Sequence, residues 1–291
     1  MRVALVTNAA SGRGTDADRV ATLLREAGAD VAVHAFDPAG SDAAVDEAAR
    51  AAAAERPDRL AVAGGDGSIG PVAVHAAAND VPLAVIPTGT ANDFARALEL
   101  PRDLDDAARL AAGEGREQAV DLLRAGDRPF LNASSVGLSV IAAHRARPLK
   151  RPLGPLAYAV GALRAGLTAK PLRCRVTVDG PQLFVGEAWQ VIVAGTGAFG
   201  GGSELEEADP GDRLVDVAVL EAGPRLALVR RAFGMRNGSL VDQPGVHHGR
   251  GRTVELELPR GTPFNVDGEV CEVSPTRFCA RDERVRVVVP A

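Results

Sequence analysis

The segment GGDGS, residues 64–68, places one acidic side chain, Asp66, among glycines directly after an apolar run typical of a buried strand. Glycine lets the backbone approach a ligand closely, and successive amides in such a turn form an anion site, reinforced where a helix begins next. A carboxylate repels phosphate, so the natural partner of Asp66 is a bridging cation, and Mg²⁺ prefers oxygen ligands. The segment therefore predicts a polyphosphate and Mg²⁺ site. The alternative for these five residues alone is a tight surface turn.

Two further polar clusters follow apolar runs, TNAASGRG at residues 7–14 and PTGTANDFAR at residues 87–96. Ligands of a parallel sheet bind at the carboxyl ends of its strands, so all three clusters are expected to meet at one cleft. The lysine of a P-loop is absent, and no G-x-G-x-x-G follows the first strand. Backbone amides would therefore have to hold the phosphates.

The elements that position these clusters alternate between strand and helix. Short valine-rich runs predict strands at residues 2–8, 30–36, 59–65 and 82–89, and helical spacing predicts helices at 15–29, 41–55 and 69–79. Strands separated by helices of this length indicate a doubly wound parallel sheet. Residues 1–122 are thus expected to form an α/β nucleotide-binding domain.

After about Asp121 the pattern changes to strand-like segments with few helices between them. They lie at residues 130–140, 173–180, 182–195, 214–222, 252–259, 264–273 and 283–290, with helical inserts at 154–167 and 225–235. This pattern predicts an antiparallel β-rich second domain over residues 123–291. The expected fold class is α/β, with the active site in the cleft between the two domains.

Composition excludes several classes of protein. The formal net charge of −5 argues against a nucleic-acid binder. The three cysteines fit no metal-ligand spacing, which favours reduced thiols in the cytoplasm. The first residues lack a signal-peptide pattern, and no apolar run reaches the roughly 20 residues of a membrane span. A soluble, cytoplasmic protein is expected, with contact to a membrane surface still open. The oligomeric state stays open.

GGDGS followed by PTGTANDFAR resembles the catalytic domain of the diacylglycerol kinase, sphingosine kinase and ceramide kinase superfamily, in its soluble bacterial lipid-kinase branch. TNAASG stands where that family has an Asn-Pro-x-Ser-Gly loop, and FLNASSVG is similar to its entry into the second domain. FGGGSELEEADPGDRLVDVAVL is similar to its triple-glycine segment and Asp-Gly-x-Leu-Asp-Val strand, and FNVDGEV carries its late Asp-Gly-Glu. The likeness covers nearly the whole chain.

The resemblance implies an ATP- and Mg²⁺-dependent kinase of a lipid hydroxyl. Glu269 would be the general base and Asp66 would hold the metal at the phosphates, whereas Asp267 is interpreted as a turn residue. A structural Mg²⁺ in the second domain would take Asp212 with groups near Asp209 and Leu214, although a solvated turn fits that acidic loop equally well. The nucleotide site implied by the resemblance comprises Asn8, Ser11, Gly12, Gly64, Gly65, Asp66, Gly67, Ser68, Thr90, Asn92 and Asp93.

The sequence departs from the family pattern at several positions. Ser68 replaces a threonine and keeps its hydroxyl, and Ala9 replaces the proline of the first loop. Gly70 and Pro71 replace an asparagine and a glutamate, with the proline expected at the start of a helix. Arg213 replaces the glycine of Asp-Gly, which puts the positive-φ turn there in question.

Basic residues gather between Arg128 and Val178, a stretch without any acidic residue. The segment from Arg145 to Arg175 mixes arginine and lysine with apolar groups, a pattern that fits either peripheral contact with anionic lipid or a solvated helical hairpin. The acceptor lipid is not determined by the sequence. Two other functions stay open: an NAD kinase-like or phosphofructokinase-like kinase of a soluble acceptor, and a nucleotide-binding regulator without turnover.

Overall fold

The computed structural model describes residues 1–8, 16–37, 42–146, 168–199, 203–205, 208–236, 239–271 and 276–291. The chain forms two compact units: unit 1 is Met1–Leu122 with Asp282–Ala291, and unit 2 is Leu123–Arg281. The sequence pattern assigns residues 282–291 to the second domain. In the structure they belong to unit 1, where β17 (Arg277–Val289) pairs with β4 (Leu83–Pro87) through Val287 and Leu83.

Unit 1 is built on a parallel sheet, as the alternation of strands and helices predicts. Strand β1 (Arg2–Asn8) lies between β2 (Asp30–Phe36) and β3 (Arg59–Gly64), and β4 pairs with the other edge of β3. Every residue of β3 is buried, since helices cover both faces of a doubly wound sheet.

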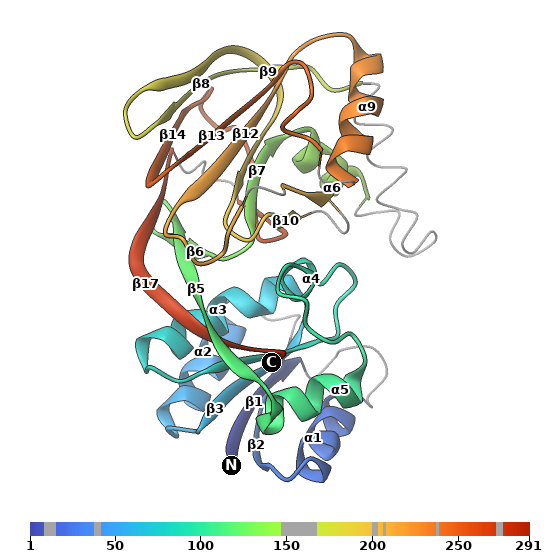
Figure 1. Ribbon diagram of the computed structural model, residues 1–291, viewed down its shortest axis with the longest axis vertical. Helices are drawn as coiled ribbons and strands as arrows, with labels where there is room; N and C mark the ends of the chain where they lie inside the picture. Colours follow the sequence, from blue (N-terminus) through green and yellow to red (C-terminus); the bar gives the residue numbers. More distant parts are fainter. Residues whose placement is uncertain are drawn as a thin grey trace. The chain divides into compact units, whose positions relative to one another are not determined.

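The helices of unit 1 pack in two groups (Figure 1). Helix α1 (Asp16–Glu26) contacts α5 (Leu104–Arg109), and α2 (Asp42–Ala54) contacts α3 (Asp66–Ala78). Right-handed crossovers place these two groups on opposite faces, because the chain moves from β1 to β2 in one direction and back to β3 in the other. The short α4 (Asp93–Ala97) and the π-helical turn η1 (Leu110–Glu114) complete this unit.

Strand register brings the carboxyl ends of the strands to one edge of the sheet. Thr7 of β1 lies beside Ala63 of β3, and Gly64 of β3 lies beside Pro87 of β4. Asn8, the glycine-rich segment and the loop after β4 therefore leave the sheet together. This arrangement is the one expected from the sequence for these strand ends.

Two helix boundaries differ from the sequence prediction. Helix α3 begins at Asp66 rather than Ile69, so Pro71 lies in its second turn and not at its start. Gly65 is the N-cap, and the acidic Asp66 sits in the first turn, where the helix dipole favours negative charge. In unit 2, α6 (Leu138–Ala146) begins where a strand is predicted to continue to Val140.

Unit 2 is an antiparallel β unit, as predicted. Strand β9 (Gln182–Ala194) pairs with β7 (Ala133–Gly137), β8 (Leu172–Val178) and β12 (Val215–Glu221). The other strands here are β6 (Arg128–Phe130), β10 (Ala198–Phe199), β11 (Ser203–Glu204), β13 (Val246–Gly251), β14 (Thr253–Glu257), β15 (Phe264–Val266) and β16 (Glu269–Cys271). Strand β5 (Arg116–Ala125) runs from unit 1 into unit 2.

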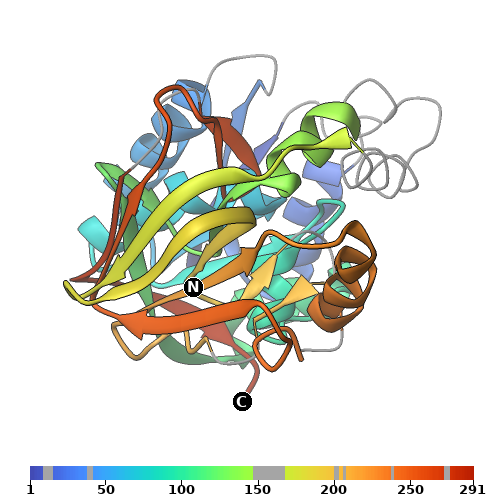
Figure 2. The same ribbon diagram turned by 90° about the horizontal axis from the view of Figure 1, so that it is seen from above.

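Helices α6 and α9 (Arg225–Arg236) lie on one side of unit 2, with β14 on the other (Figures 1 and 2). The helix predicted at 225–235 is thus confirmed, whereas the insert predicted at 154–167 lies outside the described residues.

The core of unit 2 is aromatic at its centre. The rings of Phe130 and Phe264 each contact Phe278, with centroids 6.0 and 5.7 Å apart, and all three side chains are fully buried. Burying a phenylalanine contributes roughly 1.5–3 kcal/mol. Phe130 follows Arg128, Phe264 opens β15, and Phe278 lies on β17, so this core fixes the strands that carry the polar residues described below.

Candidate active site

The glycine-rich segment joins β3 directly to α3. Gly65 has an extended backbone (φ −96°, ψ −178°) and no side chain, so no side-chain cap occupies the first amides of α3. The backbone N–H of Ser68 donates to the carbonyl of Gly65 at 2.9 Å. The result is a helix N-terminus at the carboxyl end of a buried strand, an arrangement that favours phosphate.

The loop after β4 is joined to this segment by backbone contacts. The N–H of Thr88 donates to the carbonyl of Gly64 at 3.1 Å, and a Cβ placed on Gly89 would lie 2.5 Å from the Cα of Gly65. Only glycine permits that approach, because real Cβ atoms are not found so close to a backbone carbon. The two predicted clusters therefore form one packed structure.

Asn92 and Asp93 act within this loop. Asn92 has a left-handed backbone (φ 49°), and its amide group accepts from the N–H of Gly89 and donates to the Gly89 carbonyl, both at 2.9 Å. The buried Asp93 forms an ion pair with Arg96 at 2.8 Å. Both predicted residues thus shape the loop, while Thr90 is exposed at its tip.

Asp66 is held by one of its two oxygens. Its Oδ1 accepts the N–H of Phe94, the second residue of α4, at 2.9 Å, and the side chain has no further hydrogen-bond partner among the described residues. Such a carboxylate is fixed in place and keeps an oxygen for a cation. One carboxylate is the usual protein contribution to Mg²⁺ held by phosphates and water, so Asp66 fits this role.

Of the other predicted nucleotide residues, Asn8 ends β1, whereas Ser11 and Gly12 lie outside the described residues.

Glu269 belongs to unit 2, where a two-residue turn positions it. The turn between β15 and β16 consists of Asp267 (φ 46°) and Gly268 (φ 89°), and positive φ at both residues is typical of the hairpin turn that Asp-Gly favours. Glu269, the first residue of β16, forms an ion pair with Arg128. Arg128 also donates to Sγ of Cys271 at 3.0 Å, which fixes its guanidinium beside the hairpin.

Asp267 is a turn residue, as the sequence indicates, and it also holds the start of β7. Its carboxylate accepts the backbone N–H groups of Leu131, Asn132 and Ala133 at 2.8, 2.9 and 3.0 Å. The carbonyl of Asn132 in turn accepts the N–H of Gly195 at 2.9 Å. Sequence reasoning missed these contacts and the Arg128 ion pair, because the partners are far apart in the chain and carry no local motif.

The acidic loop predicted to hold a structural metal is neutralised differently. Asp209 accepts the N–H of Gly211, and Asp212 accepts the N–H of Leu214 through Oδ1, at 2.8 and 2.9 Å. The other oxygen of Asp212 forms an ion pair with Arg250. Arg213 does adopt positive φ (63°), so the turn survives without glycine, at a backbone cost of roughly 1–2 kcal/mol.

Arg250 also approaches a buried carboxylate, Asp216, which is 1% exposed, with Nε 3.5 Å from Oδ2. The Nε2 atom of His248 lies 2.8 Å from the Oδ1 atom of Asp216. The guanidinium of Arg250 thus pairs with the oxygen of Asp212 that a metal ion would use. Asp209, Asp212 and Leu214, as arranged here, therefore do not fit a resident metal. Within the described ranges, no group of three or more histidine, cysteine, aspartate or glutamate side chains could hold a metal ion.

The basic segment is described only at its ends, since residues 147–167 lie outside the described part. On β8, Arg173 and Arg175 approach Glu187 and Glu257 at 4.0 and 3.8 Å. Within the described part of the chain, no helix is both long and apolar enough to span a membrane.

The two units together define a class of protein: a doubly wound α/β unit with glycine-rich strand ends, joined to an antiparallel β unit. The family described as "Diacylglycerol kinase catalytic domain" matches residues 2–125, and that described as "YegS C-terminal NAD kinase beta sandwich-like domain" matches residues 132–289. The chain therefore belongs to the diacylglycerol kinase and YegS-like lipid kinase family, and it is a kinase by family.

Individual relatives agree with this assignment. A "Diacylglycerol kinase" of Bacillus subtilis is 29% identical over 99% of this chain and 96% of its own. A "Probable lipid kinase YegS-like" of Pseudomonas putida is 33% identical over 80% of this chain and 77% of its own.

Solved structures share the fold. A diacylglycerol kinase of Bacillus anthracis, 22% identical, superposes with a TM-score of 0.79 over 99% of this chain and 96% of its own. An NAD kinase of Archaeoglobus fulgidus in complex with ATP, 15% identical, reaches 0.51 over 99% of this chain and 93% of its own. The predicted fold class, α/β with a C-terminal antiparallel β domain, is thereby confirmed.

Proposed function

We propose that the protein is an ATP- and Mg²⁺-dependent lipid kinase that transfers the γ-phosphate of ATP to the hydroxyl of a lipid alcohol, diacylglycerol-like or sphingoid. The observation that supports this proposal most strongly is the position and hydrogen bonding of Asp66. One of its oxygens is fixed by the Phe94 amide, and it stands at a helix N-terminus inside a glycine-rich junction. Membership of a lipid-kinase family supports a lipid as the acceptor.

In this proposal the backbone binds the phosphates. The backbone amides at the N-terminus of α3 replace the lysine of a P-loop, and the contact of Gly65 with Gly89 leaves no room for a side chain there. Asp66 holds Mg²⁺, which when bound supplies charge neutralisation for the phosphate oxygens. The side-chain amide of Asn92 keeps the second loop closed around Gly89.

Glu269 is the proposed general base. Its carboxylate accepts the proton of the acceptor hydroxyl as that oxygen bonds to the γ-phosphorus, while the bond to the bridging oxygen breaks and ADP leaves. Arg128 acts as a positioning residue, because its guanidinium forms an ion pair that orients the Glu269 carboxylate. Asp66 belongs to unit 1 and Glu269 to unit 2.

A lipid acceptor requires contact with a membrane surface in the cytoplasm. The basic residues between Arg145 and Arg175 support such contact, since each one near an anionic surface contributes about 1 kcal/mol. Binding to vesicles should rise with anionic lipid and fall with salt. Equal binding to neutral and anionic vesicles would argue against this surface.

The test of the proposed function is a panel of acceptors offered with labelled ATP and Mg²⁺. Diacylglycerol, a sphingoid base, NAD and fructose 6-phosphate should be compared, followed by a total lipid extract. Labelled phosphate in a lipid is the expected result. Transfer to NAD would favour the NAD kinase-like alternative. That alternative is tested because the family matched by the β unit is described as NAD kinase-like and an NAD kinase shares the fold. ATP binding without transfer to any acceptor would favour a regulator.

A further inference from the structure

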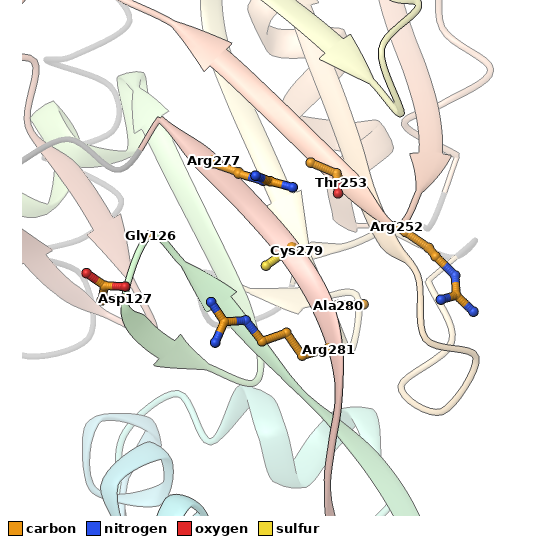
Figure 3. A pocket seen from close by; sticks show the side chains of 8 residues that line it. All are labelled: Gly126, Asp127, Arg252, Thr253, Arg277, Cys279, Ala280 and Arg281. Atoms are coloured by element: carbon orange, nitrogen blue, oxygen red, sulfur yellow. The ribbon is translucent and has the colours of Figure 1, made fainter.

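A cavity of about 500 Å³ opens on unit 2, and none of its lining residues is among those assigned to the kinase site above. Its lining residues come from the first part of β17, from β14 with the preceding Arg252, and from the turn between β5 and β6, and all of them lie within Leu123–Arg281. The lining residues are Gly126, Asp127, Arg252, Thr253, Arg277, Cys279, Ala280 and Arg281, shown in Figure 3.

The alternation of β17 sets the chemistry of this cavity. Phe278 is fully buried in the core of unit 2, so its neighbours Arg277 and Cys279 face the other way, and Arg281 follows with the same spacing. Thr253 lies directly opposite Cys279 in the β14–β17 register. Figure 3 shows the thiol of Cys279 between the side chains of Arg277 and Arg281.

The second wall is fixed by a backbone hydrogen bond. The N–H of Gly126 donates to the carbonyl of Arg277 at 2.7 Å, which holds the β5–β6 turn against β17. Asp127 of that turn is the one carboxylate among the lining residues, and Figure 3 shows the Arg281 side chain extending toward the turn. Arg252 lines the far rim and points away from Arg277 and Arg281.

The two central arginines differ from those farther along the same strand. Arg284 forms an ion pair with Asp121, and Arg286 with Glu117, both at 2.7 Å. Arg277 and Arg281 form no ion pair within the described residues. Glu255 faces Arg277 across the strand pair, yet the two side chains form no ion pair either.

We propose that this cavity binds a phosphate group, with Arg277 and Arg281 as its principal ligands and the Thr253 hydroxyl as a further donor. Guanidinium groups match the geometry of phosphate oxygens and donate in pairs. The carboxylate of Asp127, in the wall formed by the β5–β6 turn, would repel a second anionic group there and could accept a hydrogen bond from a ligand hydroxyl. The ligand class is therefore a phosphate ester, either a lipid headgroup or a soluble metabolite. This inference does not depend on the proposed kinase reaction.

The experiment measures binding without ATP. Inorganic phosphate and glycerol 3-phosphate are titrated by calorimetry, and vesicles of phosphatidylcholine alone or with phosphatidic acid are tested by sedimentation. The variant is Arg277→Gln with Arg281→Gln. The control is Arg230→Gln with Arg260→Gln, which removes the same charge from exposed residues of unit 2 outside the cavity.

We expect the double cavity variant to lose about 10-fold or more in affinity, as for removal of charge-assisted hydrogen bonds, and the control to keep wild-type affinity. Binding of the soluble probes would identify a metabolite site, and binding of phosphatidic acid vesicles alone would identify a headgroup site. Absence of binding to every probe, or equal losses in variant and control, would overturn the proposal.

A second readout uses the unmodified protein, so it does not depend on a variant that folds. Cys279 is half-buried in the cavity wall, whereas Cys174 is buried and burial raises the pKa of its thiol to about 11. Cys279 should therefore label with a maleimide far faster than Cys174. A bound phosphate ligand should slow labelling at Cys279, identified by peptide mapping, and leave Cys271 unchanged. Unchanged labelling of Cys279 under saturating probe would also overturn the proposal.

Discussion

Two aspartates next to glycine or turn residues, Asp66 at the start of α3 in unit 1 and Asp212 in a loop of unit 2, have opposite surroundings. Asp66 is fixed by a single backbone N–H, and within the described residues no cation lies against it. Asp212 also accepts a backbone N–H, but its second oxygen is taken by Arg250. A carboxylate in such a glycine-rich or loop segment is available to a metal only where no guanidinium pairs with it. For Asp212 that guanidinium belongs to Arg250, which lies 38 residues away in the sequence.

The largest expected effect is at Asp66. Asn at this position can still accept the Phe94 N–H, so Asp66→Asn should fold normally while losing the charge that holds Mg²⁺. We expect phosphoryl transfer to fall by about 10³-fold, as for loss of a strong electrostatic contact in an active site. Steady-state transfer, with the thermal melting curve as the control for folding, measures this. Transfer near the wild-type rate would remove Asp66 from the mechanism.

Glu269, like Asp212, is paired with an arginine, Arg128 in its case and Arg250 in that of Asp212, so it tests whether such pairing makes a carboxylate inert. We expect Glu269→Gln to keep ATP affinity and to slow transfer by about 10²-fold in single-turnover measurements. Arg128→Gln should slow transfer less, with ATP affinity unchanged, because the Glu269 carboxylate is kept and loses only the guanidinium that orients it. A Glu269→Gln enzyme with the wild-type transfer rate would assign the base elsewhere.

The packing of the two glycine-rich loops should matter independently of charge. Gly89→Ala places a methyl group 2.5 Å from the Cα of Gly65, so the loops must separate and ATP affinity should fall by about 10-fold or more. Gly223→Ala is the matched control, because no atom lies within 4 Å of its added Cβ. Equal ATP affinity in the two variants would show that the close approach is not needed for binding.

The smallest effects are expected at the Asp212 loop. Arg250→Gln should lower the free energy of unfolding by about 1–3 kcal/mol, since Asp212 and the buried Asp216 both lose the guanidinium that pairs with them. Arg252→Gln, an exposed neighbour whose guanidinium makes no ion pair within the described residues, should leave stability nearly unchanged. Chelation by EDTA should not move the melting temperature of the wild-type protein. A fall of several degrees with EDTA would indicate a resident metal in place of the arginine.

Much of this architecture could be predicted from the sequence, because its signals are local. Valine-rich runs separated by helical spacing gave the parallel sheet, and the order of the runs placed Gly64 and Pro87 at one edge. The start of α3 was predicted too late, at Ile69, because GGDGS was interpreted as a glycine-rich turn ahead of the helix, whereas the Gly65 cap allows helix from Asp66.

The contacts that decide the chemistry could not be predicted. Arg128 lies 141 residues from Glu269, and Arg250 lies 38 residues from Asp212. Asp267 holds the backbone at Leu131 from 136 residues away. Such pairings depend on which strands lie together, and a single sequence carries no local pattern for them.

The most direct test is the Mg²⁺ dependence of ATP binding, measured by calorimetry in the wild-type protein, Asp66→Asn and Asp212→Asn. We predict that Mg²⁺ tightens ATP binding in the wild-type protein and in Asp212→Asn by the same factor, and has no such effect in Asp66→Asn. If Asp66→Asn kept the full Mg²⁺ effect, or Asp212→Asn lost it, the assignment of the two carboxylates would be contradicted.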